Sequence, residues 1–432
     1  MASEAAVNTN VLLAAFEERC RGIIGPGHVR ATGAEDAVRG ILPALIVEPG
    51  TEQEVADVLR AADDAGLAVI PRGGGTKLEW GNAPEQADVV LSTARLSRVL
   101  AHAWSDLTAT VEAGCAVGQL QETLAEHGQR LAIDPLWPER ATIGGILSAN
   151  DSGVLRLRYG GLRDLVIGVT LALADGTLAA SGGRVVKNVA GFDLQKLATG
   201  ALGTLGVITQ ATFRLHPLPR NTRTSTMRVN DAEDLQRIML AIQDSELAHA
   251  ALQMRVGAET TPEADVLIEG TEAGLAAQDT TIRQLAGNIT IASADAAIWS
   301  ARELLWLETE GSRPLGCAIA KLTMLPADFG TISAGIARAT GSKGIRWRAV
   351  VQATGIGWLR LDGEPESMSA VLTELRGMLE SGGGSLVVLR QPVGSELDAW
   401  GSPGDALPVM RALKQQLDPR GTLNPGRFVG GI

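Results

Sequence analysis

The stretch "LAVIPRGGGTK" (residues 67–77) places three consecutive glycines directly after an apolar run that predicts a buried strand. Upstream, "ALIVEP" (44–49) predicts another strand, and "TEQEVADVLRAADDAGL" (51–67) predicts a helix that begins after Thr51 and ends at Gly66. Strand, helix and strand with short connections form a βαβ unit with parallel strands. The glycine run therefore follows the second strand, where its backbone N–H groups either bind a phosphate or form a simple turn.

The composition describes a globular protein large enough for two domains. The chain has 432 residues, 45% of them hydrophobic, and a formal net charge of -11. Because nucleic-acid binding draws much of its affinity from Lys and Arg, the negative charge argues against a nucleic-acid partner. The N-terminal stretch lacks the basic residues that begin a secretion signal. No apolar run approaches the ~20 residues that span a bilayer. We therefore expect a cytoplasmic protein with no transmembrane segment.

The three cysteines, Cys20, Cys115 and Cys317, lie far apart and form no CxxC pair. This spacing argues against a disulfide framework, a zinc site and an iron–sulfur cluster. We expect each of them to be a small buried side chain in a reducing compartment, and we expect no metal site.

The pattern of strands and helices changes near residue 222. Before it, α/β alternation dominates and Asp175-Gly176 marks a hairpin turn. After it, longer helices alternate with strands, which predicts an α+β second domain. The predicted domains are 1–222, 223–404 and 405–432.

The last of these segments is expected to return to the first domain. Its helix, predicted over 406–419, has an apolar face that needs burial. That face consists of Val409, Leu413 and Leu417.

Two further glycine-rich stretches raise the probability that several loops bind one extended ligand. They are "ATIGGILSANDSG" (141–153) and "GGRVVKNVAGFDLQKLATGALGTLGVIT" (182–209), which combine small residues with hydroxyl and amide donors. The glycine run itself matches neither the P-loop nor the GxGxxG dinucleotide fingerprint. Tight turns and close helix–strand contacts explain the same glycines equally well.

Taken in order, these motifs resemble the FAD-binding oxidoreductases of the vanillyl-alcohol oxidase type. The resemblance covers residues 40–219 and returns in the last 20 or so. Within that superfamily, "KNVAGFDLQKL" (187–197) most resembles the E subunits of bacterial glycolate oxidase complexes. The motifs that carry it are "PRGGGT", "VEAGCAVGQL", "ATIGGILSANDSG", "GLRDLVIGVTLALADG", "VKNVAGFDLQKLATGALGTLGVIT" and "LDPRGTLNPGRF".

The resemblance implies an α+β, two-domain PCMH-type fold, with two α/β subdomains around FAD and an α+β cap domain. It implies a glycine loop around the FAD pyrophosphate and further contacts along the ribityl chain and the ring. Covalent members carry a histidine where Thr76 stands, and no cysteine lies near residues 137–150, so non-covalent FAD is expected. The implied cofactor-binding residues are Arg72, Gly73, Gly74, Gly75, Thr76, Thr142, Gly144, Gly145, Ser148, Asn150, Gly203 and Ile208.

The catalytic residues are harder to assign. A 2-hydroxy acid dehydrogenase needs a cation for the carboxylate and a base for the hydroxyl proton. No histidine follows His249, and the histidine-rich metal motif of related single-subunit enzymes is missing. Tyr159 is a weak candidate for a hydroxyl donor or base, although simple aromatic packing is the commoner role. Candidate cations for the carboxylate are Arg313, Lys321, Arg346, Arg348, Arg360 and Arg390, among which the sequence gives no ranking.

Two functions from different classes follow from the resemblance. In the first, the chain is the FAD-binding subunit of a glycolate oxidase-type complex, whose partners are a separate catalytic flavoprotein and an iron–sulfur protein. Such a complex could associate peripherally with the inner face of the membrane. In the second, the chain alone is an FAD-dependent dehydrogenase of an unknown alcohol or small 2-hydroxy acid. A flavin-binding subunit without turnover is a weaker third possibility.

Overall fold

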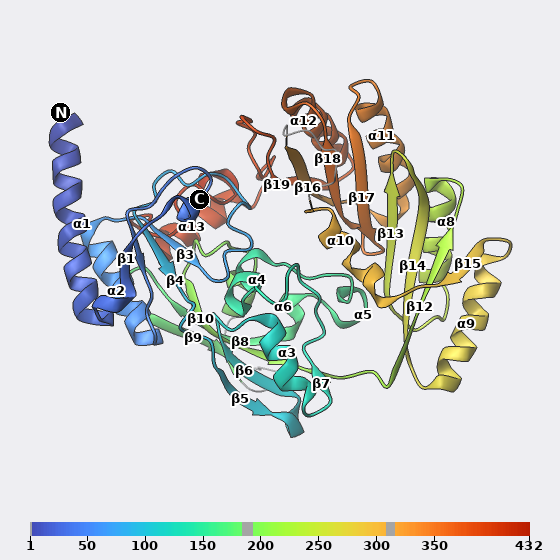
Figure 1. Ribbon diagram of the computed structural model, residues 1–432, viewed down its shortest axis with the longest axis horizontal. Coiled ribbons are helices and arrows are strands. Elements are labelled where there is room, and N and C mark those ends of the chain that lie inside the picture. The colour runs from blue at the N-terminus through green and yellow to red at the C-terminus, as the bar shows by residue number, and fades with distance from the viewer. Residues whose placement is uncertain (1, 184–192, 308–315) are drawn as a thin grey trace. The chain divides into compact units, whose positions relative to one another are not determined.

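The computed structural model describes residues 2–183, 193–307 and 316–432 (Figure 1). Arg313 and the "VKNVAGF" part of the third glycine-rich stretch therefore lie outside the described residues. Within those three ranges, no helix is both long enough and apolar enough to cross a membrane.

The chain forms two compact units. The sequence placed residues 153–160 in the first domain, whereas they pack with the second unit. The predicted domain limits themselves stay a prediction. The first unit contains Met1–Ser152, Gly161–Pro217 and Pro403–Ile432, and the second contains Gly153–Gly160 and Leu218–Ser402.

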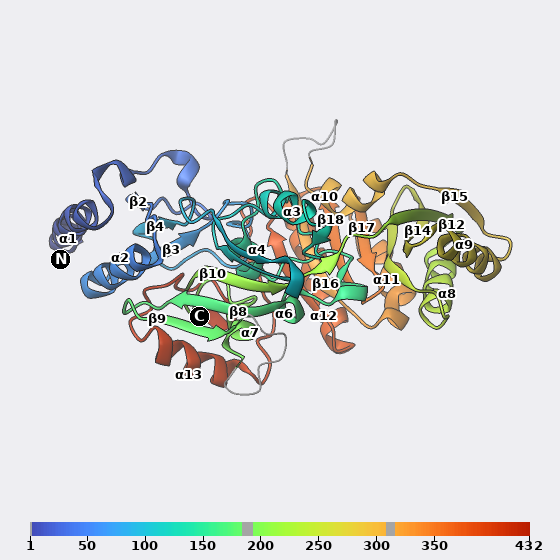
Figure 2. The same cartoon turned by 90° about the horizontal axis from the view of Figure 1, so that it is seen from below.

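The first unit begins with the predicted βαβ arrangement. Helix α2 (Glu52–Ala65) starts where the Thr51 hydroxyl accepts a hydrogen bond from the Glu54 N–H, and it ends at Gly66 with φ 66°. Strand β4 lies between β2 and β3 and pairs with both in parallel, giving the order β1-β2-β4-β3. Helix α1 (Ala2–Ile24) packs beside α2 (Figure 2). The strands are β1 (Val29–Ala31), β2 (Leu45–Val47), β3 (Val69–Arg72) and β4 (Val89–Ser92).

A second, antiparallel sheet completes the first unit, in the order β5-β6-β10-β8-β9. Its β8–β9 hairpin turns at Asp175-Gly176, as predicted, with φ 80° at the glycine. Strands β7 (Gln129–Arg130) and β11 (His216–Pro217) form a small separate ladder. The strands of the sheet are β5 (Val99–Ala103), β6 (Thr108–Glu112), β8 (Val166–Ala172), β9 (Leu178–Gly182) and β10 (Val207–Arg214). The helices are α3 (Val117–Ala125), α4 (Ile143–Ala149), α6 (Leu162–Leu165) and α7 (Leu194–Ala198).

The C-terminal segment adds to the first sheet of this unit. Leu423 forms a parallel bridge with Val69 of β3, where the Val69 N–H donates to the Thr422 carbonyl at 2.7 Å. Asp418 supports this segment, because its carboxylate accepts from the Leu423 N–H at 2.8 Å and pairs with Lys414 at 2.5 Å. The chain end is therefore built into the sheet from which the glycine run emerges.

Helix α13 (Leu407–Leu417) of this segment buries less than the sequence predicted. Leu413 and Leu417 are half-buried, but Val409 is 72% exposed, so its predicted burial is wrong. Met410 takes its place beside Leu413, because both line a cavity with residues 199–205. The spacing of apolar residues thus identified the helix but misplaced its contact face.

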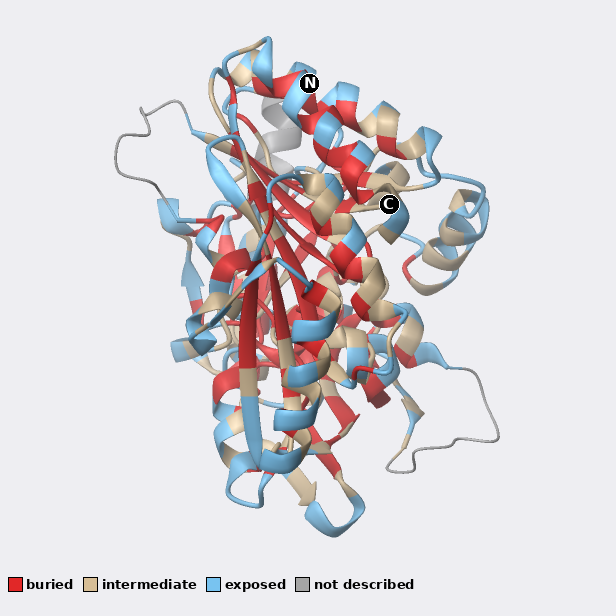
Figure 3. Ribbon diagram, turned by 90° about the vertical axis from the view of Figure 1, so that its right-hand side faces the viewer, coloured by how far each residue is buried: buried red, intermediate tan, exposed pale blue. Residues whose placement is uncertain are grey.

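The second unit is one antiparallel sheet of eight strands in the order β15-β12-β14-β13-β17-β18-β16-β19. Four helices cover one of its faces and share a single apolar core with its strands (Figure 1). Buried residues accordingly concentrate on the strands and on the inner sides of the helices (Figure 3). The helices are α8 (Ala232–Gln243), α9 (Glu272–Ala286), α11 (Phe329–Gly341) and α12 (Pro365–Ser381). The strands are β12 (Asn221–Arg228), β13 (His249–Gly257), β14 (Thr260–Gly270), β15 (Thr290–Ser293), β16 (Cys317–Thr323), β17 (Arg346–Gln352), β18 (Ile356–Asp362) and β19 (Ser385–Arg390).

The strands of this sheet also carry polar side chains that lie outside the apolar core. The alternation of a strand sends these residues to the opposite side of the sheet from the four helices. Two short helices contact this second face. Helix α5 (Arg156–Tyr159) does so through Tyr159 and Glu269, and helix α10 (Ala301–Leu304) through Arg302 and Trp358. Polar groups buried on a sheet face need hydrogen-bond partners. This face therefore carries the candidate functional residues of the second unit.

The structure of the tail leads to a stability prediction. In Asp418→Asn, Lys414 loses its carboxylate partner and keeps the carbonyls of Thr204 and Leu423, although its side chain is only 12% exposed and burial already lowers the pKa of this lysine. We expect the free energy of unfolding to fall by about 3 kcal/mol, as when one member of a buried ion pair is removed. Urea unfolding of the purified chain measures the change. Asp405→Asn, at an exposed position of the same segment, is the control. Equal stability of the two variants would contradict the proposed role of Asp418.

Candidate functional site

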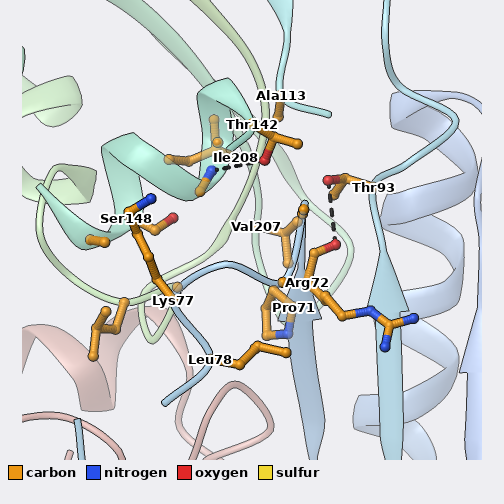
Figure 4. A pocket seen from close by; sticks show the side chains of 18 of the residues that line it. Pro71, Arg72, Lys77, Leu78, Thr93, Ala113, Thr142, Ser148, Val207 and Ile208 are labelled. Atoms are coloured by element: carbon orange, nitrogen blue, oxygen red, sulfur yellow. Dashed lines mark hydrogen bonds between the residues drawn. The ribbon is translucent and has the colours of Figure 1, made fainter. Parts of the chain in front are cut away.

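A cavity with an open volume of about 700 Å3 lies in the first unit where β3 ends (Figure 4). Cofactors and small ligands bind preferentially in concave places of this kind. The glycine run, helix α4, residues 202–208 and the tail line it. Asn150 is absent from its wall. The sequence-predicted residues that line the cavity are Arg72, Gly73, Gly74, Gly75, Thr76, Thr142, Gly144, Gly145, Ser148, Gly203 and Ile208.

The glycine run requires glycine for two different reasons. A Cβ on Gly74 would overlap the backbone carbonyl oxygen of Arg140, and one on Gly73 would overlap the Thr142 hydroxyl. Gly75 instead has φ +70°, a conformation that residues with a Cβ rarely adopt. Neither Gly73 nor Gly74 has a positive φ. The run therefore combines close backbone packing with a left-handed turn.

Helix α4 brings the second glycine cluster to the cavity. The Thr142 hydroxyl caps the helix by accepting a hydrogen bond from the Gly145 N–H at 3.3 Å. A Cβ on Gly144 would lie 2.9 Å from the Cβ of Ala113, so glycine allows α4 to approach the end of β6. Asn150 ends the helix with φ 48°, which explains why this residue turns away from the lining.

Lys77, which the sequence motifs did not assign to the site, fixes the end of the glycine run. Its ammonium group lies 3.2 Å from the Asp151 carboxylate and 3.4 Å from the Leu136 carbonyl oxygen. It also lies 5.8 Å from the ring centre of Trp80 and 5.6 Å from that of Trp137. A lysine held in this way positions the loop and brings positive charge to the cavity wall.

Arg72 contributes its backbone to the cavity rather than its charge. Its guanidinium group points away from Thr142 and Ser148 (Figure 4) and pairs with Asp36 at 2.7 Å. Asp36 also pairs with Arg30 at 2.9 Å. Hydrogen bonds from Arg30 and then Arg72 outweigh burial and hold the pKa of Asp36 well below its usual value. This buried carboxylate therefore anchors the strand end that precedes the glycines.

The tail supplies the remaining wall with two residues that the sequence motifs did not assign to the site. Asn424 donates to the Leu202 carbonyl at 2.5 Å, while its Oδ1 is buried and has no hydrogen-bond partner among the described residues. Arg427, only 3% exposed, donates to the carbonyl oxygens of Leu78 at 2.6 Å and Trp80 at 2.7 Å. Burial, with Arg39 nearby, lowers the pKa of Arg427 to about 10, which still leaves it charged at pH 7. Arg427 thus ties the chain end to the segment after the glycine run.

The lining suits an anionic, extended cofactor such as FAD. All three of its charged residues, Arg72, Lys77 and Arg427, are cationic. Glycine backbone leaves room for close approach by a pyrophosphate, whose oxygens accept hydrogen bonds from N–H groups. The buried Oδ1 of Asn424 offers an acceptor to a ligand N–H or O–H group. The residues present therefore fit the cofactor that the sequence resemblance implied.

The second unit contains a cluster of cations around one tryptophan. The Arg302 guanidinium lies 4.6 Å from the ring centre of Trp358, and both side chains are buried. Lys321 of β16 lies directly opposite Trp358 of β18, so the two side chains share a face of the sheet. Arg302 thus contacts the Trp358 ring and Lys321 is its cross-strand neighbour, and only Lys321 was named from the sequence.

The other predicted cations have different surroundings. Arg360 is 2% exposed and binds Asp362 through three hydrogen bonds of 2.6 to 2.9 Å. Arg390 stacks on Trp306 at 5.1 Å, and Arg346 is exposed. Among the described residues, no three His, Cys, Asp or Glu side chains form a group suited to a metal ion. The geometry therefore ranks Arg302 and Lys321 first among the second unit's candidates for binding a carboxylate.

Tyr159 lies in α5 and is engaged with the sheet of the second unit. Its hydroxyl donates to Glu269 of β14 at 2.5 Å, and the neighbouring Arg158 donates to the Ala248 carbonyl at 2.6 Å. Burial, with the charge of Arg158, lowers the pKa of His249 at the start of β13. Tyr159, Glu269 and a neutral His249 are therefore the proton-accepting and proton-donating groups at this end of the sheet.

Comparison with known proteins identifies first the class and then the family. A family model described as an FAD binding domain matches residues 43–182. The structure of p-cresol methylhydroxylase with bound substrate superposes with a TM-score of 0.77 at 16% identity, covering 97% of this chain and 96% of that one. The molecule is thus a flavoprotein of the PCMH-type fold, and the predicted fold class is confirmed.

Curated relatives define the family more closely. Mitochondrial D-2-hydroxyglutarate dehydrogenase of Bos taurus is 30% identical, over 91% of this chain and 78% of its own length. Subunit GlcD of the Bacillus subtilis glycolate oxidase is 33% identical over 42% of this chain. The chain belongs to the family of FAD-dependent oxidoreductases that contains D-2-hydroxyglutarate dehydrogenase, and FAD is its cofactor. It spans less than half the length of GlcD and of the similar D-lactate dehydrogenases of Arabidopsis thaliana and Archaeoglobus fulgidus.

The glycine run provides a direct test of the cavity. In Gly74→Ala, the added methyl group must displace the Arg140 carbonyl, so the loop can no longer close on the cofactor. We expect FAD to bind at least roughly tenfold more weakly, the loss that corresponds to about one charge-assisted hydrogen bond. Flavin content after purification and FAD titration of the stripped protein measure it. Gly27→Ala makes the same change where no atom lies within 4 Å and is the control. Unchanged FAD affinity in Gly74→Ala would refute this role for the loop.

The Asp36 anchor predicts a pH dependence. Because the pKa of Asp36 is lowered by folding, its contribution is complete above the unfolded value, about 3.9, and is lost as pH falls through the folded value. We expect Asp36→Asn to lower the free energy of unfolding by about 1.5–3 kcal/mol at pH 7, with the difference shrinking below pH ~4. Denaturant unfolding at several pH values checks this. Asp64→Asn, which breaks an exposed pair with Arg19, should change stability by less than about 1 kcal/mol. A difference that stays constant with pH would contradict the assignment.

Proposed function

We propose that this chain serves the FAD-dependent oxidation of a small 2-hydroxy acid, as the FAD-binding subunit of a glycolate oxidase-type complex. The resemblance of "KNVAGFDLQKL" to E subunits and the similarity to GlcD support the complex. Its proposed partners are a catalytic flavoprotein subunit and an iron–sulfur subunit. The cavity at the end of β3 would hold a non-covalent FAD, and residues 73–76 would bind its pyrophosphate.

The observation that carries the chemistry is the contact of Arg302 with Trp358, whose cross-strand neighbour is Lys321. A 2-hydroxy acid has one carboxylate, and a guanidinium group can bind it through two parallel hydrogen bonds. Stacking on the buried Trp358 ring holds the Arg302 guanidinium in one orientation, so less entropy is lost when substrate binds. In this proposal Arg302 binds the carboxylate and Lys321 adds a second positive charge.

Oxidation also requires that the substrate hydroxyl lose its proton. In the second unit, Tyr159 and Glu269 already share a hydrogen bond of 2.5 Å, so a proton can pass from the phenol to the carboxylate. Glu269, however, lies six residues along β14 from Glu263, the residue level with Trp358 across β13 and β17. The Tyr159–Glu269 pair therefore cannot reach the hydroxyl of a small acid whose carboxylate is at Arg302, and no base is assigned. FAD, when bound, accepts the hydride from the substrate carbon.

A self-sufficient dehydrogenase is the second candidate. The similarity to D-2-hydroxyglutarate dehydrogenase extends over 91% of this chain and includes both units. Such an enzyme would complete substrate oxidation without partner subunits. The two candidates differ in whether the isolated chain reduces its own flavin.

An anaerobic absorption spectrum of the purified chain separates them. Glycolate, D-lactate and D-2-hydroxyglutarate are added in turn, first to the chain alone and then to the chain with its partner subunits. Bleaching of the flavin band only with partners supports the complex, and bleaching of the isolated chain supports the second candidate. No bleaching with any of these acids in either setting overturns the proposal of 2-hydroxy acid oxidation.

The carboxylate site is tested in whichever setting reduces flavin. Arg302→Met should raise the substrate concentration for half-maximal reduction about tenfold or more, because one charge-assisted interaction is lost. Arg302→Lys keeps a charge and should lose less. Arg338→Met, at an exposed position of α11, is the control and should behave as the native chain. Equal substrate dependence of Arg302→Met and the control would exclude Arg302 from substrate binding.

A further inference from the structure

A second cavity of the second unit lies between its sheet and helix α10 and has an open volume of about 1,040 Å3. It is separate from the FAD cavity, which belongs to the first unit. Strands β12, β13, β14 and β17 contribute charged side chains to it, and α10 contributes apolar ones. The proposed function uses none of its charged residues.

Two of its three arginines have their charge compensated. Glu263 accepts a hydrogen bond from Arg228 at 2.7 Å and pairs with Arg255 at 2.6 Å. Arg255 also pairs with Asp265 at 2.7 Å, and this aspartate is fully buried. Two carboxylates therefore balance two guanidinium groups, and these four side chains form a closed network beside the cavity.

Arg348 is the third arginine, and it has no such partner. Among the described residues, no hydrogen bond or ion pair reaches its side chain, and its Nη2 is buried. Its direct cross-strand neighbours are Gly257 of β13 on one side and Arg360 of β18 on the other. Because Arg360 is occupied by Asp362, the sheet places no acidic residue opposite Arg348. A buried, uncompensated guanidinium atom is unfavourable unless a ligand supplies an acceptor.

The backbone beside Arg348 is shaped to accommodate it. A Cβ on Gly257 would lie 3.2 Å from the Cγ of Arg348 and 2.9 Å from the Thr260 hydroxyl. Glycine at this position thus leaves space for the arginine stem along the β13–β14 hairpin. Both Arg348 and Thr260 line the cavity. The cavity therefore offers free space next to the unpaired guanidinium donor of Arg348.

The opposite wall of the cavity is apolar. Ala301, Leu304 and Leu305 of the α10 region line it, and Leu304 is 51% exposed although it is a large aliphatic residue. A ligand that only carried charge would leave this wall in contact with water. An anion with an apolar group would satisfy Arg348 and cover the leucines together.

We propose that this cavity binds an organic carboxylate with an apolar chain, whose charge is taken by Arg348. The site goes beyond the proposed function, since it requires neither FAD nor turnover. The carboxylate has two possible sources, the far end of an extended substrate or a separate small molecule. Both present the same chemistry to Arg348.

Calorimetric titration of the purified full chain with hexanoate tests the site. Hexanoate should bind at one site per chain, whereas 1-hexanol, which has the same chain without the charge, should bind at least about tenfold more weakly. Arg348→Met should weaken hexanoate binding about tenfold or more, and Arg348→Lys should retain part of it. Arg346→Met removes an exposed arginine two residues away on the same strand and should bind as the native chain does.

Several outcomes would overturn the proposal. These are no binding of hexanoate, equal binding of hexanol, or equal affinity in the Arg348→Met and Arg346→Met variants. Because Arg348→Lys retains a long cationic side chain, its binding shows that a loss in Arg348→Met does not come from unfolding. Flavin content should be unchanged in all variants, so failure here is distinguishable from failure of the proposed function.

The source of the carboxylate follows from flavin-reduction rates measured with hexanoate present. If hexanoate raises the half-saturating concentration of substrate and leaves the maximal rate unchanged, the cavity holds part of the substrate. If that concentration does not change, the cavity binds a separate molecule. The rise in the half-saturating concentration requires Arg348 and should be absent in Arg348→Met.

Discussion

The close packing of backbone against backbone at the end of β3 is the constraint on which the flavin unit depends. Gly74 lies against the Arg140 carbonyl with no room for even one methyl group. This contact joins the first sheet of the unit to the segment that leads into α4. If the two segments moved apart, the cavity would lose two of its walls at once. The cofactor site therefore depends on the contact between the first sheet and the segment that leads into α4.

The chain end completes this arrangement for an electrostatic reason. Arg427 is buried, and carbonyl oxygens at 2.6 to 3.4 Å compensate its charge. A guanidinium group with five donors can bind several carbonyls that no single neutral side chain could reach. It thereby connects residues 78–82 to a segment more than 300 positions away in the sequence. The wall that follows the glycine run thus stays in place only when the last residues of the chain are folded.

Local signals in the sequence predicted the elements, and tertiary contacts determined the rest. The start of α2 at Thr51 and its end at Gly66 were predictable, because capping chemistry operates within one turn. The left-handed φ at Gly75 rather than Gly74 was not, since three adjacent glycines give no local preference. Arg427 and Arg302 were missed for the same reason. Each is an ordinary arginine until folding places it against carbonyl groups or an aromatic ring.

The buried cations beside the flavin cavity and Arg302 of the second unit have different surroundings. In the first unit, Lys77 and Arg427 are held by main-chain oxygens and by Asp151, so their charge organises the protein itself. In the second unit, the Arg302 guanidinium lies 4.6 Å from the ring centre of Trp358, an aromatic rather than a carbonyl environment. If the proposed carboxylate site is correct, substrate preference can change through the second unit while the flavin site stays constant. This distribution of charges favours a flavin unit that stays constant and a second-unit sheet that varies.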